Sequence, residues 1–152
     1  MNAPAPITTL AISDITDADV EAVIALWQRC GLTRPWNDPA SDIALARRKA
    51  NSTVLVGRAG GAIVASAMVG HDGHRGWVYY VAVDPDRQKQ GFGRAIMHAA
   101  EQWLRAAGLP KLQLLVRREN LKAGAFYQSI GYEEADTIVF AKWIDGRPSQ
   151  KT

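Results

Sequence analysis

The segment that most restricts the fold is the run from Trp77 to Val83, in which every residue is apolar or aromatic. Side chains alternate between the two faces of a strand, so both faces of this one need cover. That pattern is typical of a central strand with other layers packed on each side. Asp84-Pro85 ends the run, because proline cannot donate to a ladder of hydrogen bonds. The run therefore predicts a sheet covered on both faces, most simply by helices.

Helical periodicity marks four other segments. Thr16 and Asp19 form a capping-box pair ahead of apolar residues spaced as one helix face, and Asp38-Pro39 is a cap followed by a first-turn proline. A long stripe of Phe92, Ile96, Ala99 or Ala100, and Trp103 follows the central run. The expected helices run from Thr16 to Gly31, Asp38 to about Asn51, Phe92 to Gly108, and Asn120 to Ile130.

Strand-like segments surround these helices, and Gly60-Gly61 is a two-residue hairpin signal. Antiparallel strands come first and strand-helix units later, which predicts an α/β (α+β) fold with a mixed sheet and helices on both faces. The chain is expected to be one domain, 1–152, with an ordered core over 7–144 and loose termini. The expected strands are Ile7–Ile15, Thr53–Ala59, Ala62–Val69, Trp77–Val83, Lys111–Arg117 and Tyr132–Ile144.

Composition narrows the class of protein. Of the 152 residues, 47% are hydrophobic and 22% charged, as in an average globular domain, and no apolar run reaches the roughly 18 residues that span a bilayer. The lone Cys30 can form neither an internal disulfide nor a zinc site by itself, and no secretory signal is visible, so we expect a cytoplasmic protein without a metal. The net charge of +3 suits an anionic small molecule. The sequence has no stripe of interleaved basic and aromatic residues, so we expect no nucleic acid partner. We also expect no membrane partner.

The segment Val81 to Arg94 carries the strongest chemical signal. A buried strand leads through a polar loop with Gly91 and Gly93 into a helix, whose first amides lack partners within the helix. Those amides, the helix dipole and the basic side chains of the loop favour a pyrophosphate. The loop lacks both the Walker lysine and the three-glycine dinucleotide pattern. An ordinary turn with glycine for packing remains the alternative.

Two motifs resemble the GNAT superfamily of N-acetyltransferases. Gln88-x-x-Gly91-x-Gly93 is similar to its acyl-CoA loop, and Asn120-x-x-Ala123-x-x-Phe126-Tyr127-x-x-x-Gly131-Tyr132 to its downstream segment. The order of elements from Ile7 to Ile144 fits as well. The segments 34–39 and 72–76 resemble those of the YpeA-type subgroup.

The resemblance implies a largely antiparallel sheet that splays between the strand ending at Val83 and the strand Lys111–Arg117, where pantetheine would lie. It implies acetyl-CoA as cosubstrate, with the Val81 amide stabilising the oxyanion and Tyr127 protonating the departing thiolate. A non-catalytic acyl-CoA-binding or sensing module is the alternative. The residues implied for the cosubstrate are Val81, Ala82, Val83, Gln88, Lys89, Gln90, Gly91, Phe92, Gly93, Arg94, Asn120 and Tyr127.

The acceptor is expected to be a small-molecule or peptide amine, and a small cationic or zwitterionic one is favoured. The related ribosomal-protein alanine acetyltransferases carry a glutamate base where this chain has Leu115, which disfavours a peptide N-terminus. The base is left open between His74, Asp72, Asp38, Tyr79 and a water relay, and a homodimer is an open alternative. The residues expected around the acceptor are Arg34, Trp36, Asn37, Asp38, Asp72, His74, Arg75 and Tyr79.

Overall fold

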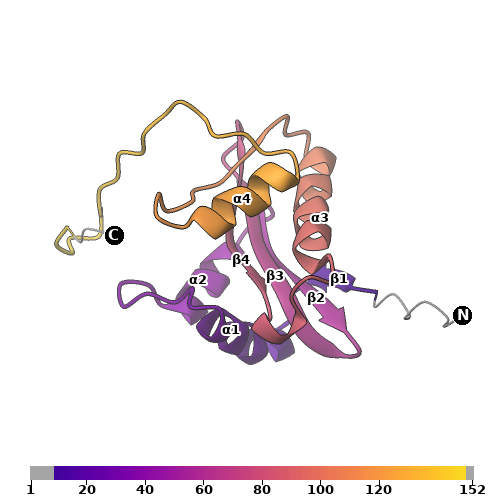
Figure 1. Cartoon of the computed structure of the whole chain (residues 1–152). Helices are drawn as coiled ribbons and strands as arrows, with labels where there is room; N and C mark the ends of the chain where they lie inside the picture. The colour runs from indigo at the N-terminus through magenta and orange to yellow at the C-terminus, as the bar shows by residue number, and fades with distance from the viewer. Residues whose placement is uncertain (1–8, 150–152) are drawn as a thin grey trace, which may run out of the picture. The chain divides into compact units, whose positions relative to one another are not determined.

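A computed structural model describes residues 9–149 of the chain. The chain divides into two compact units, Met1–Leu115 and Val116–Thr152, which are described separately below as the first and the second unit. The first unit holds the whole sheet and three of the four α-helices in the described part (Figure 1).

The sheet has five strands in the order β1-β2-β3-β4-β5. The first four are antiparallel neighbours, and β5 is parallel to β4, which confirms the predicted mixed, largely antiparallel sheet. Gly60 and Gly61 both have positive φ (59° and 86°) in the β2–β3 turn, as the hairpin signal predicted. The strands are β1 Ala11–Asp14, β2 Ser52–Ala59, β3 Ala62–His71, β4 Gly76–Val83 and β5 Leu112–Gln113.

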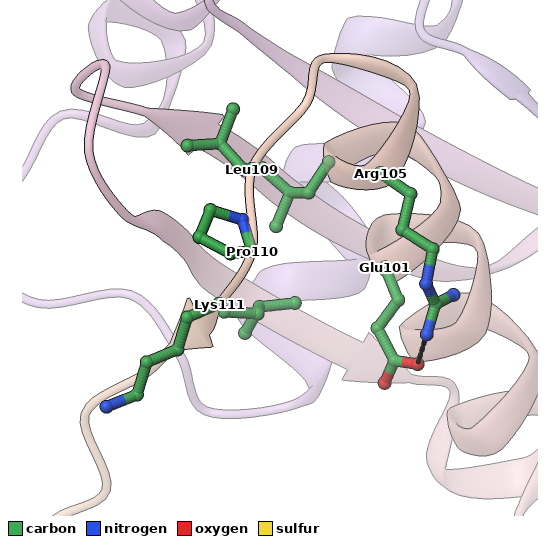
Figure 2. A pocket seen from close by; sticks show the side chains of 7 residues that line it. Glu101, Arg105, Leu109, Pro110 and Lys111 are labelled. Atoms are coloured by element: carbon green, nitrogen blue, oxygen red, sulfur yellow. Dashed lines mark ion pairs between the residues drawn. The ribbon is translucent and has the colours of Figure 1, made fainter.

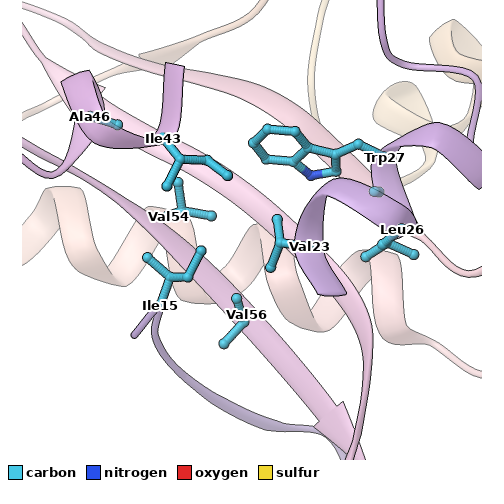
Figure 3. Packing of buried hydrophobic residues seen from close by; sticks show 9 residues of the cluster. Ile15, Val23, Leu26, Trp27, Ile43, Ala46, Val54 and Val56 are labelled. Atoms are coloured by element: carbon cyan, nitrogen blue, oxygen red, sulfur yellow. The ribbon is translucent and has the colours of Figure 1, made fainter. Parts of the chain in front are cut away.

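Helices cover both faces of this sheet. On one face, α1 (Val20–Arg29) and α2 (Pro39–Ala46) pack against β2, β3 and β4, and on the other α3 (Phe92–Ala106) packs against the same strands (Figures 1 and 3). Two short 3-10 turns complete the unit, η1 (Asp17–Asp19) before α1 and η2 (Pro85–Arg87) after β4. The central position predicted for Trp77–Val83 is confirmed, because β4 lies between β3 and β5.

The core on the α1/α2 face is built around Trp27, which is fully buried. Figure 3 shows its indole beside Val23 of the same helix and Ile43 of α2, above Val54 and Val56 of β2. Burial of large apolar side chains such as these is worth about 1.5–3 kcal/mol each. This layer therefore holds α1 and α2 on the sheet.

Helix starts follow the sequence signals, whereas helix ends depend on neighbours. The Thr16–Asp19 capping box is present, and Asp38 caps α2 with Pro39 at its first position. The expected extension of α2 to Asn51 is wrong, because the Ser52 hydroxyl takes the Ala46 carbonyl at 2.7 Å, an acceptor that a longer helix would use. In α3 the buried stripe ends on Leu104 rather than on Trp103, which is only half-buried.

Two of the expected strands are shorter in the structure than predicted. The segment Ile7–Ile15 contributes only β1, with residues 7 and 8 outside the described part, and Lys111–Arg117 contributes only the two residues of β5.

In the second unit, α4 (Leu121–Ser129) is followed by irregular chain, so the strand expected over Tyr132–Ile144 is wrong for the structure described. Ile138, Val139, Phe140 and Ile144 are exposed there, because apolar β-forming residues make a strand only when another strand pairs with them.

Candidate active site

The outer edge of β4 is open over most of its length. The parallel ladder with β5 contains only Gly76 opposite Leu112 and Trp77 opposite Gln113. From Val78 onward, no strand of the described residues pairs with the side of β4 that faces away from β3. An open edge of this kind presents main-chain donors and acceptors to which an extended ligand can add like another strand.

A bulge in β4 turns one of these main-chain groups outward. Tyr79 pairs with Met68 and Ala82 with Ser66, so Tyr80 and Val81 together oppose one residue of β3. The Ser66 hydroxyl donates to the Tyr80 carbonyl at 2.9 Å, which fixes that carbonyl toward β3. In a trans peptide the carbonyl and the following N–H point in opposite directions. The Val81 amide therefore points away from β3, toward the open edge.

The main-chain groups of Val83 also face away from β3. The Asp84 amide donates to Val64 at 2.8 Å, and the alternation of an antiparallel ladder then turns the intervening Val83 to the other side. Its carbonyl accepts from Gln88 Nε2 at 3.2 Å and from Cys30 Sγ at 3.3 Å. Gln88, which the sequence placed in the cosubstrate loop, thus ties that loop to the end of β4.

The loop after β4 leads directly into the start of α3. Lys89 and Gly91 have positive φ, 62° and 79°, and Gly91 is the N-cap of α3 without any side-chain cap. The amides of the first turn have no carbonyl within the helix to bind, and their N–H groups form the positive end of the helix dipole. A Cβ built on Gly91 would meet no atom within 4 Å, so the space beside this backbone is open.

In the segment that joins β4 to the first turn of α3, an apolar side chain is buried, while charged side chains are exposed to solvent. Phe92 is buried at 2% exposure, and the Arg87 guanidinium lies over its ring, 5.6 Å from the centroid. Lys89, Gln90 and Arg94 are exposed. The backbone is thus held by an apolar anchor while the cations stay available to an anion, which fits the sequence-predicted pyrophosphate site.

The two carboxylates expected near the acceptor have local bonds. Asp38 accepts from the amides of Ala40 and Ser41, at 3.0 and 3.3 Å, as the cap of α2. Asp72 accepts from the amides of His74 and Arg75, at 2.9 and 2.8 Å, within the β3–β4 turn. The Ser41 hydroxyl, which donates to Asp38 at 3.0 Å, and then these amides hold the pKa of Asp38 below its ordinary value, and the amides of Arg75 and His74 do the same for Asp72. Both carboxylates therefore remain ionised and exposed.

Other residues expected at the acceptor differ in exposure. Trp36 and Asn37 are half-buried, and Arg34 binds the carbonyls of Gly31 and Thr33, at 2.8 and 3.1 Å. His74 is exposed in its turn, Arg75 is half-buried, and Tyr79 is 48% exposed.

Sequence reasoning missed a polar cluster under β4. The Tyr80 hydroxyl donates to Asp42 Oδ2 at 2.6 Å and also bonds the Asn37 side chain. The Tyr80 ring stacks on Trp27 with centroids 3.8 Å apart and planes 7° apart. Burial raises the pKa of Tyr80 far above its ordinary value, and the Asp42 carboxylate beside the hydroxyl raises it further. Tyr80 is at least 38 positions from each of these partners along the chain, and no motif connects it to them. Only the fold therefore brings Tyr80 to them.

The second unit carries Tyr127, expected to serve catalysis, and Asn120, expected to bind the cosubstrate. Tyr127 lies on α4, with its ring edge-on to Phe126 and Tyr132 at centroid distances of 5.0 and 5.9 Å. Burial raises the pKa of Tyr127 to about 12. Asn120 caps α4 through the Ala123 amide at 3.1 Å.

A separate hollow lies at the C-terminal end of α3 (Figure 2). Glu101 and Arg105 on its wall form an ion pair at 3.8 Å. Because α3 has 15 residues, this hollow is roughly 20 Å from the glycine start of the helix. It contains none of the residues predicted for the site. Its lining is Glu101, Leu104, Arg105, Leu109, Pro110, Lys111 and Leu112.

Residues 9–149 lack two kinds of feature. Within that range no helix has the length and apolar character needed to cross a membrane. The same residues contain no group of three or more His, Cys, Asp or Glu side chains placed to hold a metal ion.

Comparison with known proteins defines the class of enzyme. Residues 14–132 match the model of the acetyltransferase (GNAT) family, and the chain belongs to that family. A Yersinia enterocolitica protein named as an acetyltransferase is 44% identical over 125 residues, which cover 82% of this chain and 89% of that protein. An acetyltransferase of Pectobacterium atrosepticum is 44% identical over 124 residues, 82% of this chain and 88% of its own. The expectation of an acetyl-CoA-dependent N-acetyltransferase is thereby confirmed.

Solved structures share the fold. The ribosomal-protein-S18-alanine N-acetyltransferase of Escherichia coli is 29% identical, with a TM-score of 0.72 over 84% of this chain and 79% of that one. The aminoglycoside N-acetyltransferase AAC(6')-Iy, solved in complex with CoA, is 15% identical, with a TM-score of 0.79 over 94% and 99% of the two chains. The second likeness concerns the fold alone.

Proposed function

We propose that this enzyme transfers an acetyl group from acetyl-CoA to a primary amine by direct attack of the amine on the thioester. The observation that carries the proposal is the outward Val81 amide on the open edge of β4, followed along the chain by the glycine start of α3. Pantetheine is extended and amide-rich, so it suits an open strand edge. A pyrophosphate suits the start of a helix. One cosubstrate can therefore engage both features.

The loop from Gln88 to Arg94 is proposed to hold the pyrophosphate. Main-chain amides at Gly91, Phe92, Gly93 and Arg94 would donate to its oxygens, because the helix leaves its first amides without partners. Lys89 and Arg94 add exposed positive charge. Val81, Ala82 and Val83 would bind the pantetheine arm, and the family resemblance adds Asn120 and Tyr127 to the residues proposed to bind the cosubstrate.

The proposed reaction needs one oxyanion donor and one proton donor. The neutral amine attacks the acetyl carbonyl carbon, a C–N bond forms, and the oxygen becomes anionic beside the Val81 amide. The C–S bond then breaks, and the thiolate takes the Tyr127 proton. The tyrosinate regains a proton that the amine nitrogen releases, so the products are an amide and free CoA. A pKa of about 12 keeps Tyr127 protonated at neutral pH, as a donor must be.

The acceptor is proposed to be a small amine that carries positive charge. Asp38 and Asp72 are ionised and exposed, and Trp36 is half-buried in the loop before α2, where an aromatic face can contact a cation or its apolar part. The fold is shared with an enzyme named for aminoglycosides, which are amines of this kind. Acetyl-CoA consumption against panels of polyamines, amino acids, aminoglycosides and peptides would identify the substrate.

The cosubstrate site is tested by calorimetry with CoA on substitutions of Gly91. Gly91→Asp places a carboxylate beside the proposed pyrophosphate, so binding should be lost. Gly91→Asn has nearly the same shape without the charge and tolerates positive φ, so it should retain measurable binding. The control Gly61→Asp makes the same change at a glycine of similar φ, 86°, in the β2–β3 turn, and should bind normally. Unchanged CoA affinity in a folded Gly91→Asp variant would contradict the site.

A further inference from the structure

We propose that Ser66 is a positioning residue for acetyl transfer: together with Trp27 it locks the Tyr80–Val81 peptide so that the Val81 amide faces the thioester. The inference rests on the oxyanion role proposed above for that amide. It adds two buried side chains, on α1 and β3, that act on the reaction only through a backbone group.

The contacts form one chain of hydrogen bonds. Trp27 Nε1 donates to the Ser66 hydroxyl at 2.8 Å, and that hydroxyl donates to the Tyr80 carbonyl at 2.9 Å. Trp27 and Ser66 are both fully buried. Because the indole N–H can only donate, it occupies the acceptor side of the hydroxyl and directs the hydroxyl proton to Tyr80. The direction of the Tyr80 carbonyl is therefore set by a side chain rather than by the regular ladder of the sheet.

Tyr80 needs such restraint because its backbone is in an uncommon conformation. Its φ of 52° is in the left-handed region, which bulky residues avoid. Residues persist there only when their surroundings hold them, and such residues gather at functional sites. The surroundings of Tyr80 hold it at several points: the Trp27 ring stacks on it, Asp42 and Asn37 bond its hydroxyl, and Ser66 bonds its carbonyl.

Loss of the Ser66 bond would act on the Val81 amide directly. The Tyr80 carbonyl and the Val81 amide belong to one planar peptide, so a rotation of the carbonyl turns the N–H by the same angle. An oxyanion donor contributes only when it is aimed at the developing charge, and loss of one such donor costs about 100-fold to 1000-fold in rate. A donor that is misdirected only part of the time should lower the rate by a smaller factor, of at least about 10-fold.

The test uses acetyl-CoA labelled with 13C at the acetyl carbonyl, so it does not depend on the unknown acceptor. Infrared difference spectra of the wild-type complex should show the carbonyl stretch at lower frequency than in free acetyl-CoA, because a donated hydrogen bond polarises it. In Ser66→Ala most of that shift should be lost, while the calorimetric affinity for acetyl-CoA changes less than about threefold. Turnover with any acceptor found should fall about 10-fold or more, with the KM for acetyl-CoA nearly constant.

A matched control separates positioning from general destabilisation. Ser52 also donates its hydroxyl to a backbone carbonyl, that of Ala46 at 2.7 Å, but on β2 at the end of α2. Ser52→Ala should lower stability while leaving the carbonyl shift and the turnover as in wild type. Ser66→Cys fills the same space with a weaker donor and should give an intermediate shift, which keeps the test decisive if Ser66→Ala folds poorly.

The outcomes distinguish this inference from the proposed function. A wild-type shift that persists in full in both Ser66 variants would overturn the positioning role and leave the Val81 role intact. Acetyl-CoA that binds wild type without any carbonyl shift would overturn both. A shift lost in Ser66→Ala and also in Ser52→Ala would mean general destabilisation, and would overturn the positioning role alone.

Discussion

At the scale of single residues, the site depends on backbone groups as much as on side chains. Val81 and Val83 present main-chain atoms, and their own side chains are ordinary strand residues. Gly91 was predictable from the motif, because glycine at a helix start implies positive φ or close approach of a ligand. Asp42 and Ser66 were not predictable, since their partners Tyr80 and Trp27 are distant in sequence and no spacing rule connects them.

Tyr127 allows a prediction at the same scale. If its hydroxyl protonates the thiolate, Tyr127→Phe should lower kcat about 100-fold and leave the affinity for acetyl-CoA nearly unchanged. Steady-state kinetics with an identified acceptor, together with calorimetry, would measure both. Tyr132→Phe removes a hydroxyl from a ring that touches Tyr127 edge-on, and should keep most of the activity. Wild-type turnover in Tyr127→Phe would exclude the role.

The pH profile gives an independent check on Tyr127. Burial raises its pKa to about 12, so the phenol stays protonated through pH 10, where an ordinary tyrosine is half ionised. Ionisation of Tyr127 should therefore not lower kcat between pH 8 and 10. The shape of the kcat profile in that range should be the same in wild type and in Tyr127→Phe. A loss near pH 10 that vanishes in the variant would show a tyrosine with an ordinary pKa.

At the scale of helices and strands, caps and turns could be predicted from neighbouring residues, whereas pairing with distant parts of the chain could not. The capping box at Thr16, the Asp38-Pro39 start and the Gly60-Gly61 turn each depend on residues within a few positions, and all three are present. The end of α2 depends on Ser52, which binds the last carbonyl from the next strand. The strand expected over Tyr132–Ile144 depends on a pairing edge, which no periodicity of its own residues can supply.

The start of α1 gives a prediction on acid stability. Asp19 is buried, its carboxylate pairs with Arg58 of β2 and accepts from the Thr16 amide at 2.9 Å, and these bonds lower its pKa to about 2. A carboxyl with a lowered folded pKa stabilises the fold above its unfolded pKa, near 4, and loses that contribution as pH falls toward 2. The shift corresponds to at most about 2.5 kcal/mol.

Urea unfolding of Asp19→Asn across pH 7 to 2 measures this contribution. The variant should be less stable than wild type by about 1–2 kcal/mol at pH 7, and the difference should shrink between pH 4 and 2. Asp17→Asn is the control, because Asp17 is 96% exposed in its pair with Arg47 and should change stability little. A difference that stays constant with pH would mean that Asp19 acts through packing rather than through its charge.

At the scale of the whole molecule, charge and topology agree with an anionic extended ligand. The chain carries a formal net charge of +3. The sheet leaves one edge of β4 open where β5 departs, and α3 begins at Phe92, after the loop that follows β4. The order of elements was sufficient to predict a mixed sheet with helices on both faces, and the family resemblance implied the opening beside β4. The degree of opening was not predictable, because it depends on how few residues of β5 pair with β4.

Binding of acetyl-CoA to the folded chain should raise its thermal stability. A ligand that binds only the native state adds about 2.7 kcal/mol at 100 times its Kd. For a chain of 152 residues this corresponds to a Tm increase of about 5–10 °C. Differential scanning calorimetry with and without acetyl-CoA measures it, and inorganic pyrophosphate at the same concentration should give a much smaller increase, since it cannot occupy the β4 edge. An equal increase with pyrophosphate would show a general anion site instead of a cosubstrate site that extends along β4.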